Sequence, residues 1–320
     1  MGNVESALLH IQSGSNIVAT RYHNGNEATN MFSFNDLKSI DDHIVPVFSR
    51  LNVLCCLAGR MVPPIYAPST EDDSPHEDLA DSSIRLTSII NVCLRYINQA
   101  ITKARISSIN VDDVVEQSKL QSRLDAWRKQ LDRLTGRMQT VDKLEKQNAI
   151  NLLLVQYKVI YIWIRVCTTA GEMVADSYFD DYEELVHYAE NIAKPGAGTA
   201  NPQLLSFEIQ LVAPLYDTAL KCRHPAIRRR ALNLLQSVPR REGIWNAHHA
   251  YVTAKRVIEL EERTLDKQGL PDETSRLHAF PLPDERSRIS SLGKLPFKFR
   301  ELGHTILLSP AYPGPPEAML

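Results

Sequence analysis

The chain has 320 residues, enough for one large domain or two modest ones with a substantial core. Hydrophobic residues make up 43% and charged residues 23%, ordinary globular values that exclude a wholly disordered chain. The formal net charge of −2 excludes a chain built throughout as an electrostatic clamp on nucleic acid, although it leaves room for a local basic patch.

Cysteine usage and hydropathy favour an intracellular protein without a membrane partner. The five cysteines are odd in number and most lie in apolar helical runs, so we expect buried free thiols in a reducing compartment. The opening residues lack the basic and apolar regions of a signal peptide. The longest apolar run, Ile150–Val166, is interrupted by Gln156, Lys158 and Arg165, which predicts a buried helix rather than a membrane span.

Helical periodicity begins near the start of the chain. Apolar residues at three- and four-residue spacings predict helices over residues 4–15, 37–57 and 84–106. Between the last two, the stretch at about 62–78 is polar and rich in proline, which predicts a loop.

A regular apolar seam follows, with alternating steps of four and three residues. Its members are Leu120, Leu124, Trp127, Leu131 and Leu134. In a coiled coil such positions face a second helix, so the seam is a candidate for self-association and makes a homodimer one hypothesis. The favoured alternative is that the seam packs inside its own bundle, because a coiled-coil assignment needs three or four heptads.

The second half of the chain continues the helical pattern. It predicts helices over residues 150–175, 180–193, 207–221, 225–235 and 245–263, with a glycine- and proline-rich loop at about 194–203. Proline, serine and glycine then increase, which predicts an irregular tail over 266–320. The predicted fold is therefore all-α: a helical domain over 1–265, built as a bundle of antiparallel helix pairs, and an irregular C-terminal tail.

The most informative stretch runs from Leu211 to Trp245 and reads LVAPLYDTALKCRHPAIRRRALNLLQSVPRREGIW. It predicts a helix, a Cys-Arg-His-Pro break, a second helix with a basic face, and a Pro-Arg-Arg-Glu-Gly turn into a third helix. This succession resembles the C-terminal regulatory region of fungal binuclear zinc-cluster transcription factors, most specifically at about residues 205–262. The residues that carry the resemblance are Pro214, Tyr216, Arg223, Pro225, Arg229, Arg230, Pro239, Arg240, Arg241, Glu242, Gly243 and Trp245.

The resemblance implies a nuclear, non-enzymatic helical domain that modulates transcription. It would act through partners such as transcription factors or other regulatory proteins, or through a small effector held between helices. We interpret the matching residues as structural: Pro239 ends a helix, Gly243 supplies a flexible turn, and Trp245 anchors the next helix in the core.

The DNA-binding cluster of the resembling family is not found in this sequence. It requires six cysteines in closely spaced groups, because two zinc ions share the thiolates. We therefore do not expect direct DNA binding. The chain is expected to be either a regulatory domain without its DNA-binding domain or the product of a gene model that begins after the DNA-binding domain.

One hypothesis for the arginines Arg228–Arg230, with Arg240 and Arg241, is that they bind nucleic acid. The favoured alternative is that they coat the solvent face of one helix and pair with carboxylates. An ion pair between Arg241 and Glu242 would then lock the following turn.

The sequence indicates no catalytic site, no cofactor site and no metal site. It contains no glycine-rich phosphate loop and no nucleophile or metalloprotease motif. The adjacent His248 and His249 would point about 100° apart on a helix, which disfavours a shared metal ion.

The second function hypothesis is a helical scaffold or adaptor protein outside the nucleus, in the cytoplasm.

Overall fold

The computed structural model describes residues 4–23, 43–57, 62, 74–106, 108–193, 211–238, 241–243 and 245–277. Over these residues the fold is all-α, as predicted: helices pack in pairs, and the described strands form one two-stranded hairpin. The predicted loop at about 194–203, most of the loop at about 62–78, Pro239 and Arg240 lie outside the described residues.

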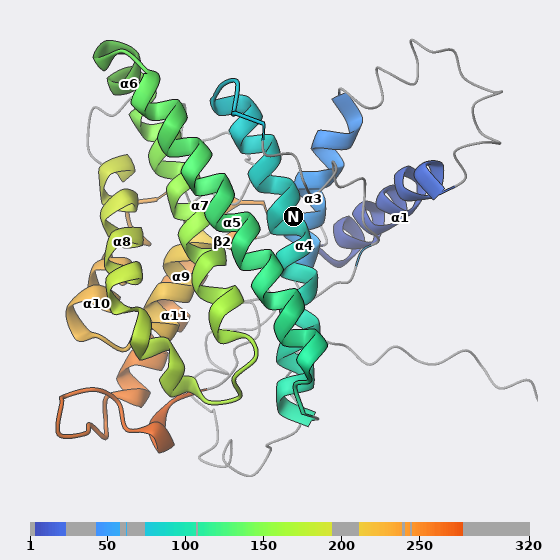
Figure 1. Ribbon diagram of the computed structural model, residues 1–320. Coiled ribbons are helices and arrows are strands. Elements are labelled where there is room, and N and C mark those ends of the chain that lie inside the picture. The colour runs from blue at the N-terminus through green and yellow to red at the C-terminus, as the bar shows by residue number, and fades with distance from the viewer. Residues whose placement is uncertain are drawn as a thin grey trace, which may run out of the picture.

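The first half of the chain builds one side of the bundle. Its helices are α1 (Val4–His23), α3 (Val45–Leu57), α4 (Leu79–Ile106), α5 (Val111–Arg137) and α6 (Thr140–Glu145). Figure 1 shows α4 and α5 as long antiparallel neighbours, with α3 and α1 to one side. α5 begins at a capping box, in which the Asn110 side chain accepts a hydrogen bond from the Asp113 N–H and the Asp113 carboxylate accepts one from the Asn110 N–H.

The second half adds the remaining helices and the hairpin. Its elements are α7 (Gln147–Val166), η3 (Glu172–Tyr178), α8 (Phe179–Ala193), α9 (Val212–Lys221), α10 (Pro225–Leu234), β1 (Arg241–Glu242), β2 (Trp245–Asn246), α11 (Ala247–Glu261) and η4 (Glu273–Ser275). Pro225 occupies the first turn of α10, as predicted, where its missing N–H costs nothing.

The predicted buried helix at 150–166 forms most of α7, in the middle of the bundle. Ile160, Ile162 and Ile164 have no exposed surface. Within the described residues, α7 is the one helix long and apolar enough to cross a membrane by length and composition, and 61% of its apolar window is buried in the fold. α7 packs against α4, α5 and α8, so its apolar side chains are buried in the core.

The apolar seam of α5 also lies in the core. All its members are at most 6% exposed, and α5 packs against α4 and α7. The Trp127 ring stacks on Tyr157 with 5.7 Å between the centroids, while its indole N–H donates to the Ser82 carbonyl oxygen at 2.9 Å. The seam therefore packs inside its own bundle, and the self-association proposed for Leu120, Leu124, Trp127, Leu131 and Leu134 is corrected, because their surfaces are already covered.

The cysteines are buried and free, as predicted. Burial raises the pKa to about 12 for the thiols of Cys56, Cys93, Cys167 and Cys222. Because the thiolate is the reactive form, these side chains act as small apolar core residues.

The segment after α11 is irregular and packs on the helical body. Leu265 forms an isolated β-bridge with Pro271, and the turn between them uses Gly269 at a φ of +78°. Leu270 is 8% exposed and Arg276 only 3%. Leu270 and Arg276 thus pack on the helical body, whereas residues 278–320 of the predicted tail lie outside the described residues.

Candidate functional site

The Arg-Arg-Glu-Gly turn closes onto the start of α9. The Glu242 carboxylate is 2% exposed and accepts hydrogen bonds from the N–H groups of Leu211 at 2.9 Å and Val212 at 2.8 Å. These N–H groups have no partner inside the helix, and the helix dipole favours a negative charge there. Glu242 therefore locks the turn to the beginning of α9.

Gly243 is required by the geometry of this turn. Its φ is +57°, a region that side-chain-bearing residues adopt at a cost. A Cβ atom at this position would lie 3.0 Å from Leu54 Cδ1. The hairpin that Gly243 closes pairs Glu242 with Trp245, so it sets the positions of both side chains.

Trp245 packs at the junction of the hairpin and α9. It is 9% exposed, and its ring lies against Tyr216 with 5.8 Å between the centroids. The next residue, Asn246, caps α11 by accepting a hydrogen bond from the His249 N–H at 3.1 Å. The burial of the Trp245 ring agrees with the interpretation of this residue as an anchor for the following helix.

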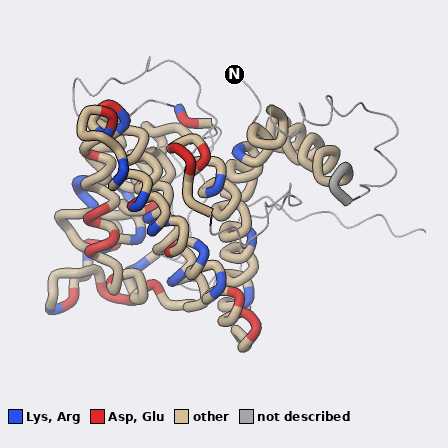
Figure 2. Tube along the Cα trace, turned by 45° about the horizontal axis from the view of Figure 1, so that its top comes forward, with Lys and Arg blue, Asp and Glu red and all other residues tan. Residues whose placement is uncertain are grey.

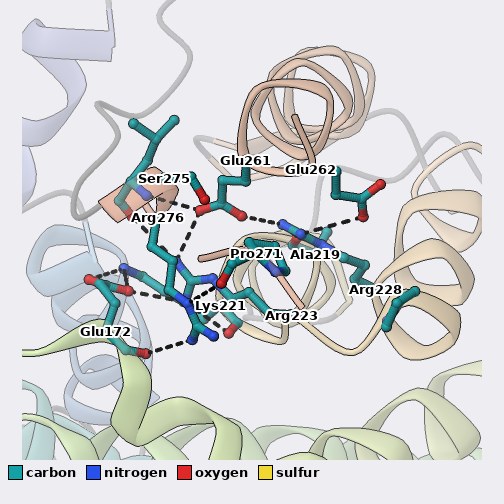
Figure 3. A network of polar contacts seen from close by, with 12 residues as sticks. Glu172, Ala219, Lys221, Arg223, Arg228, Glu261, Glu262, Pro271, Ser275 and Arg276 are labelled. Atoms are coloured by element: carbon teal, nitrogen blue, oxygen red, sulfur yellow. Dashed lines mark hydrogen bonds and ion pairs between the residues drawn. The ribbon is translucent and has the colours of Figure 1, made fainter. Parts of the chain in front are cut away.

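A buried group of charges, which we call the Glu261 cluster, joins α9, α10, α11 and the C-terminal segment (Figure 3). It consists of Glu172, Asp176, Lys221, Arg223, Arg228, Glu261 and Arg276. Arg223 donates to Glu261 Oε1 and to Glu172 Oε2, both at 3.1 Å. Arg228 donates to Glu261 Oε2 at 2.7 Å. Each carboxylate oxygen of Glu261 thus holds a different guanidinium.

Burial and ion pairing compete in setting the pKa of the two arginines. Burial opposes the charged form of Arg223, but the attraction of Glu261 and Glu172 outweighs it, and the pKa is raised. For Arg228 burial dominates over the attraction of Glu261, and the pKa is lowered. Both guanidinium groups stay charged near neutral pH, because arginine titrates far above it.

The prediction that the arginine run coats a solvent face is wrong for Arg228. Arg228 has no exposed surface and donates to the Ala219 carbonyl oxygen as well as to Glu261. Positions three and seven residues later, Ala231 and Leu235, lie on the same buried face of the helix. Arg228 therefore points into the core between α9 and α11.

The prediction of carboxylate pairing is confirmed for all three arginines, and Arg229 and Arg230 form their pairs nearer the surface than Arg228 does. Arg229 pairs with Glu262, and Arg230 pairs with Glu190 at 2.8 Å and with Glu183 at 3.0 Å. Hydrogen bonding to Glu190 raises the pKa of Arg230. The positive charge of this surface is thus compensated within the chain.

The described segment after α11 is attached to the cluster through Arg276 and Leu277. Arg276 lies 2.6 Å from Asp176 Oδ2 and donates to the Pro271 carbonyl oxygen at 3.0 Å. The Leu277 N–H donates to Glu261 Oε1 at 3.0 Å. Glu261 therefore connects two arginines and the backbone of the segment in one place.

Several cluster members were missed by the sequence interpretation, which singled out Arg223 but not its partners. Glu261 carries a usable signal, because it continues the buried stripe of Ala250, Ala254 and Ile258 on α11. Glu172 and Arg276 carry none, since Glu172 begins the short 3-10 helix η3 and Arg276 follows η4, and neither belongs to a longer periodic face. Of the predicted residues, Arg223, Glu242 and Trp245 become buried, whereas Arg229, Arg230 and Arg241 lie nearer the surface.

The arrangement connects elements rather than presenting an open reaction centre. Among the described residues, no group of three or more His, Cys, Asp or Glu is placed to hold a metal ion. The rings of His248 and His249 lie 6.2 Å apart and are tilted by 56°. No protein-family model, curated protein or solved structure matches the chain.

Proposed function

We propose that this chain is a regulator of transcription that acts in the nucleus through protein partners or a small effector. It would work without enzymatic activity and without a zinc cluster of its own. The proposal rests on the resemblance over residues 205–262. The observation that carries it is the interlocked structure of the motif, in which Arg223, Glu242 and Trp245 hold α9, α10, the hairpin and α11 together.

The charge pairing of the motif supports a structural role over a DNA contact. Arg228 is buried, and Arg229 and Arg230 already pair with carboxylates. Binding a phosphate there would require breaking these pairs and desolvating the groups again, which costs free energy. A regulatory domain that acts on other proteins does not need these arginines to be free.

A tethering assay tests the proposal. The full chain is fused to an unrelated DNA-binding domain, and transcription of a reporter carrying that domain's binding site is measured against the DNA-binding domain alone. We expect a reproducible rise or fall in the reporter. The matched control is Glu261→Ala, which should weaken the effect because it destabilises the fold.

Localisation separates this proposal from the scaffold alternative. A fluorescent fusion to either end of the chain should accumulate in the nucleus. A protein found only in the cytoplasm, combined with a silent reporter, would reject the regulator proposal and favour a scaffold or adaptor.

A further inference from the structure

The exposed side of α5 carries apolar and acidic residues near its beginning and basic residues near its end. We call this side the α5 outer face. Its members are exposed and lie away from the buried seam; they are Val111, Asp112, Val114, Val115, Glu116, Lys129, Arg133 and Arg137. Figure 2 shows Asp and Glu in red at the beginning of α5 and Lys and Arg in blue recurring along the rest of the helix. The charges of the outer face are thus separated along the helix into an acidic end and a basic end.

Neither end of the outer face is neutralised within the part of the chain that the structure describes. At the acidic end, Asp112 has no ion pair there, and Glu116 makes an exposed contact of 3.8 Å with Lys119. At the basic end, no described carboxylate pairs with any of the three cations. The neighbouring Asp132 pairs instead with Arg128 at 3.2 Å. Both ends therefore have charge available to a partner.

Large apolar side chains are exposed near both ends of α5. At its beginning, Val111 is 77% exposed, and Val114 and Val115 are 48% and 46% exposed. α6 follows the end of α5, and its Val141 and Leu144 are 65% and 69% exposed. Apolar side chains gathered in this way, rather than scattered singly, are typical of an interaction surface.

The middle of the outer face is built for close approach. Ser118 and Ser122 are small and exposed, and each hydroxyl donates to a carbonyl oxygen of its own helix at 2.9 Å. A partner helix could therefore pack closely here without leaving a hydroxyl group unpaired.

We propose that the α5 outer face binds the same face of a second copy of this chain, with the two α5 helices antiparallel about a two-fold axis. When the helices overlap over their full length, Asp112 of one copy lies within one residue of the level of Arg137 of the other, and Glu116 lies equally close to the level of Arg133. Asp112 and Arg137 are only about 20° apart around the helix, and a two-fold axis brings the same flank of both copies together. The acidic end of each copy thus meets the basic end of the other.

The apolar residues follow the same symmetry. In the antiparallel pair, the beginning of one α5 comes next to the end of the other, where α6 follows. The exposed valines of each copy would then lie near the exposed Val141 and Leu144 of the other. An isologous interface makes each of these contacts twice.

The order of the charges argues for a second copy over other partners. An acidic peptide or a nucleic acid lying along the outer face would meet the cations at one end but be repelled by Asp112 and Glu116 at the other. A basic segment would be repelled at the opposite end. The partner has to carry the reverse order of charges, and this chain turned end for end carries it.

The expected dimer is weak. α5 has 27 residues and is therefore about 40 Å long, with a width of about 10 Å. Such a strip lies at the lower end of the size of specific interfaces, so we expect dissociation at micromolar concentrations. The inference does not depend on a role in transcription, because a scaffold protein could dimerise through the same face.

Sedimentation velocity of the full chain over about a hundredfold range of micromolar concentrations measures the association. Two variants each make the outer face carry one sign of charge at both ends, and a control changes the net charge at exposed positions away from α5. Circular dichroism checks that each variant is folded. The variants are Arg133→Glu/Arg137→Glu, Asp112→Lys/Glu116→Lys and, as the control, Lys255→Glu/Lys267→Glu.

We expect the full chain and the control to dimerise alike, and each charge variant alone to associate about tenfold or more weakly, because like charges then meet at both ends. Mixing the two charge variants should restore the dimer, since each then offers the charge that the other lacks. Val111→Ser/Val115→Ser, which leaves every charge in place, should also weaken association.

Three results would overturn the proposal. The full chain could remain monomeric over the whole range, which would assign the outer face to a different partner. The control could lose association as strongly as the charge variants do. The two charge variants could fail to associate when mixed although both are folded and the full chain dimerises, which would place the dimer interface elsewhere.

Discussion

Arg228 of α10 and Glu261 of α11 form an ion pair at 2.7 Å in which neither side chain has exposed surface. The other oxygen of Glu261 holds Arg223 at 3.1 Å, also without exposure. A pair of this kind is costly to desolvate, so its net contribution to stability is small while it is intact. Removing Glu261 is different, because the buried Arg228 would keep only a 3.7 Å contact with Glu262 and the buried Arg223 would keep only Glu172.

Glu261→Ala is therefore expected to lower the free energy of unfolding by about 3–5 kcal/mol, since Arg223 and Arg228 both lose their shared carboxylate. Urea unfolding followed by circular dichroism measures the change. The matched control is Glu259→Ala on the same helix, where an exposed pair with Arg256 contributes about 0–1 kcal/mol. Equal effects of the two substitutions would contradict the central place given to Glu261.

Glu242 makes a second test of the motif. Glu242→Ala should cost about 1–2 kcal/mol, because the N–H groups of Leu211 and Val212 lose their acceptor at a buried helix start. Glu242→Gln keeps an acceptor oxygen without the charge and should lose less. Amide hydrogen exchange at Leu211 and Val212 reports the loss locally. Unchanged exchange at both positions in Glu242→Ala would reject the cap.

Trp245→Ala is expected to destabilise the protein by about 3–5 kcal/mol, because a large buried ring that packs against Tyr216 is removed. Trp245→Phe keeps most of the packing and should cost clearly less. Thermal unfolding of the two variants gives the comparison. A Trp245→Ala protein as stable as the original would mean that the ring does not anchor α11.

The all-α fold could be predicted because helical periodicity is local information. The burial of α7 and of the Trp127 seam follows directly from three- and four-residue spacings. The Glu261 cluster could not be predicted in the same way. Glu172 and Leu277 are far apart in the sequence and join the cluster only through tertiary contacts, Glu172 with Arg223 and Leu277 with Glu261. The burial of Arg228 was not predicted, because a run of three arginines suggests a solvent-exposed face. Its position nevertheless lies on the same buried face of the helix as Ala231 and Leu235.

The ionisation of Asp217 predicts how the stability of the fold depends on pH. Burial raises the pKa of its carboxyl group to about 6, against a hydrogen bond from Trp163 and the attraction of Lys221, which lower it. Since the folded protein holds this proton more tightly than the unfolded chain, the stabilisation is complete below about pH 4 and is lost as the pH rises through about 6. The charged carboxylate thus costs stability at neutral pH.

Asp217→Asn removes this titration, because an amide stays neutral. Relative to the original protein, the variant should gain stability as the pH rises from about 4 to 7, by up to about 2 kcal/mol. Unfolding free energies of both proteins across this range give the difference, in which the titration of all other groups cancels. Curves that stay parallel would show that Asp217 titrates normally, and the carboxyl group would then be solvated rather than enclosed beside Trp163.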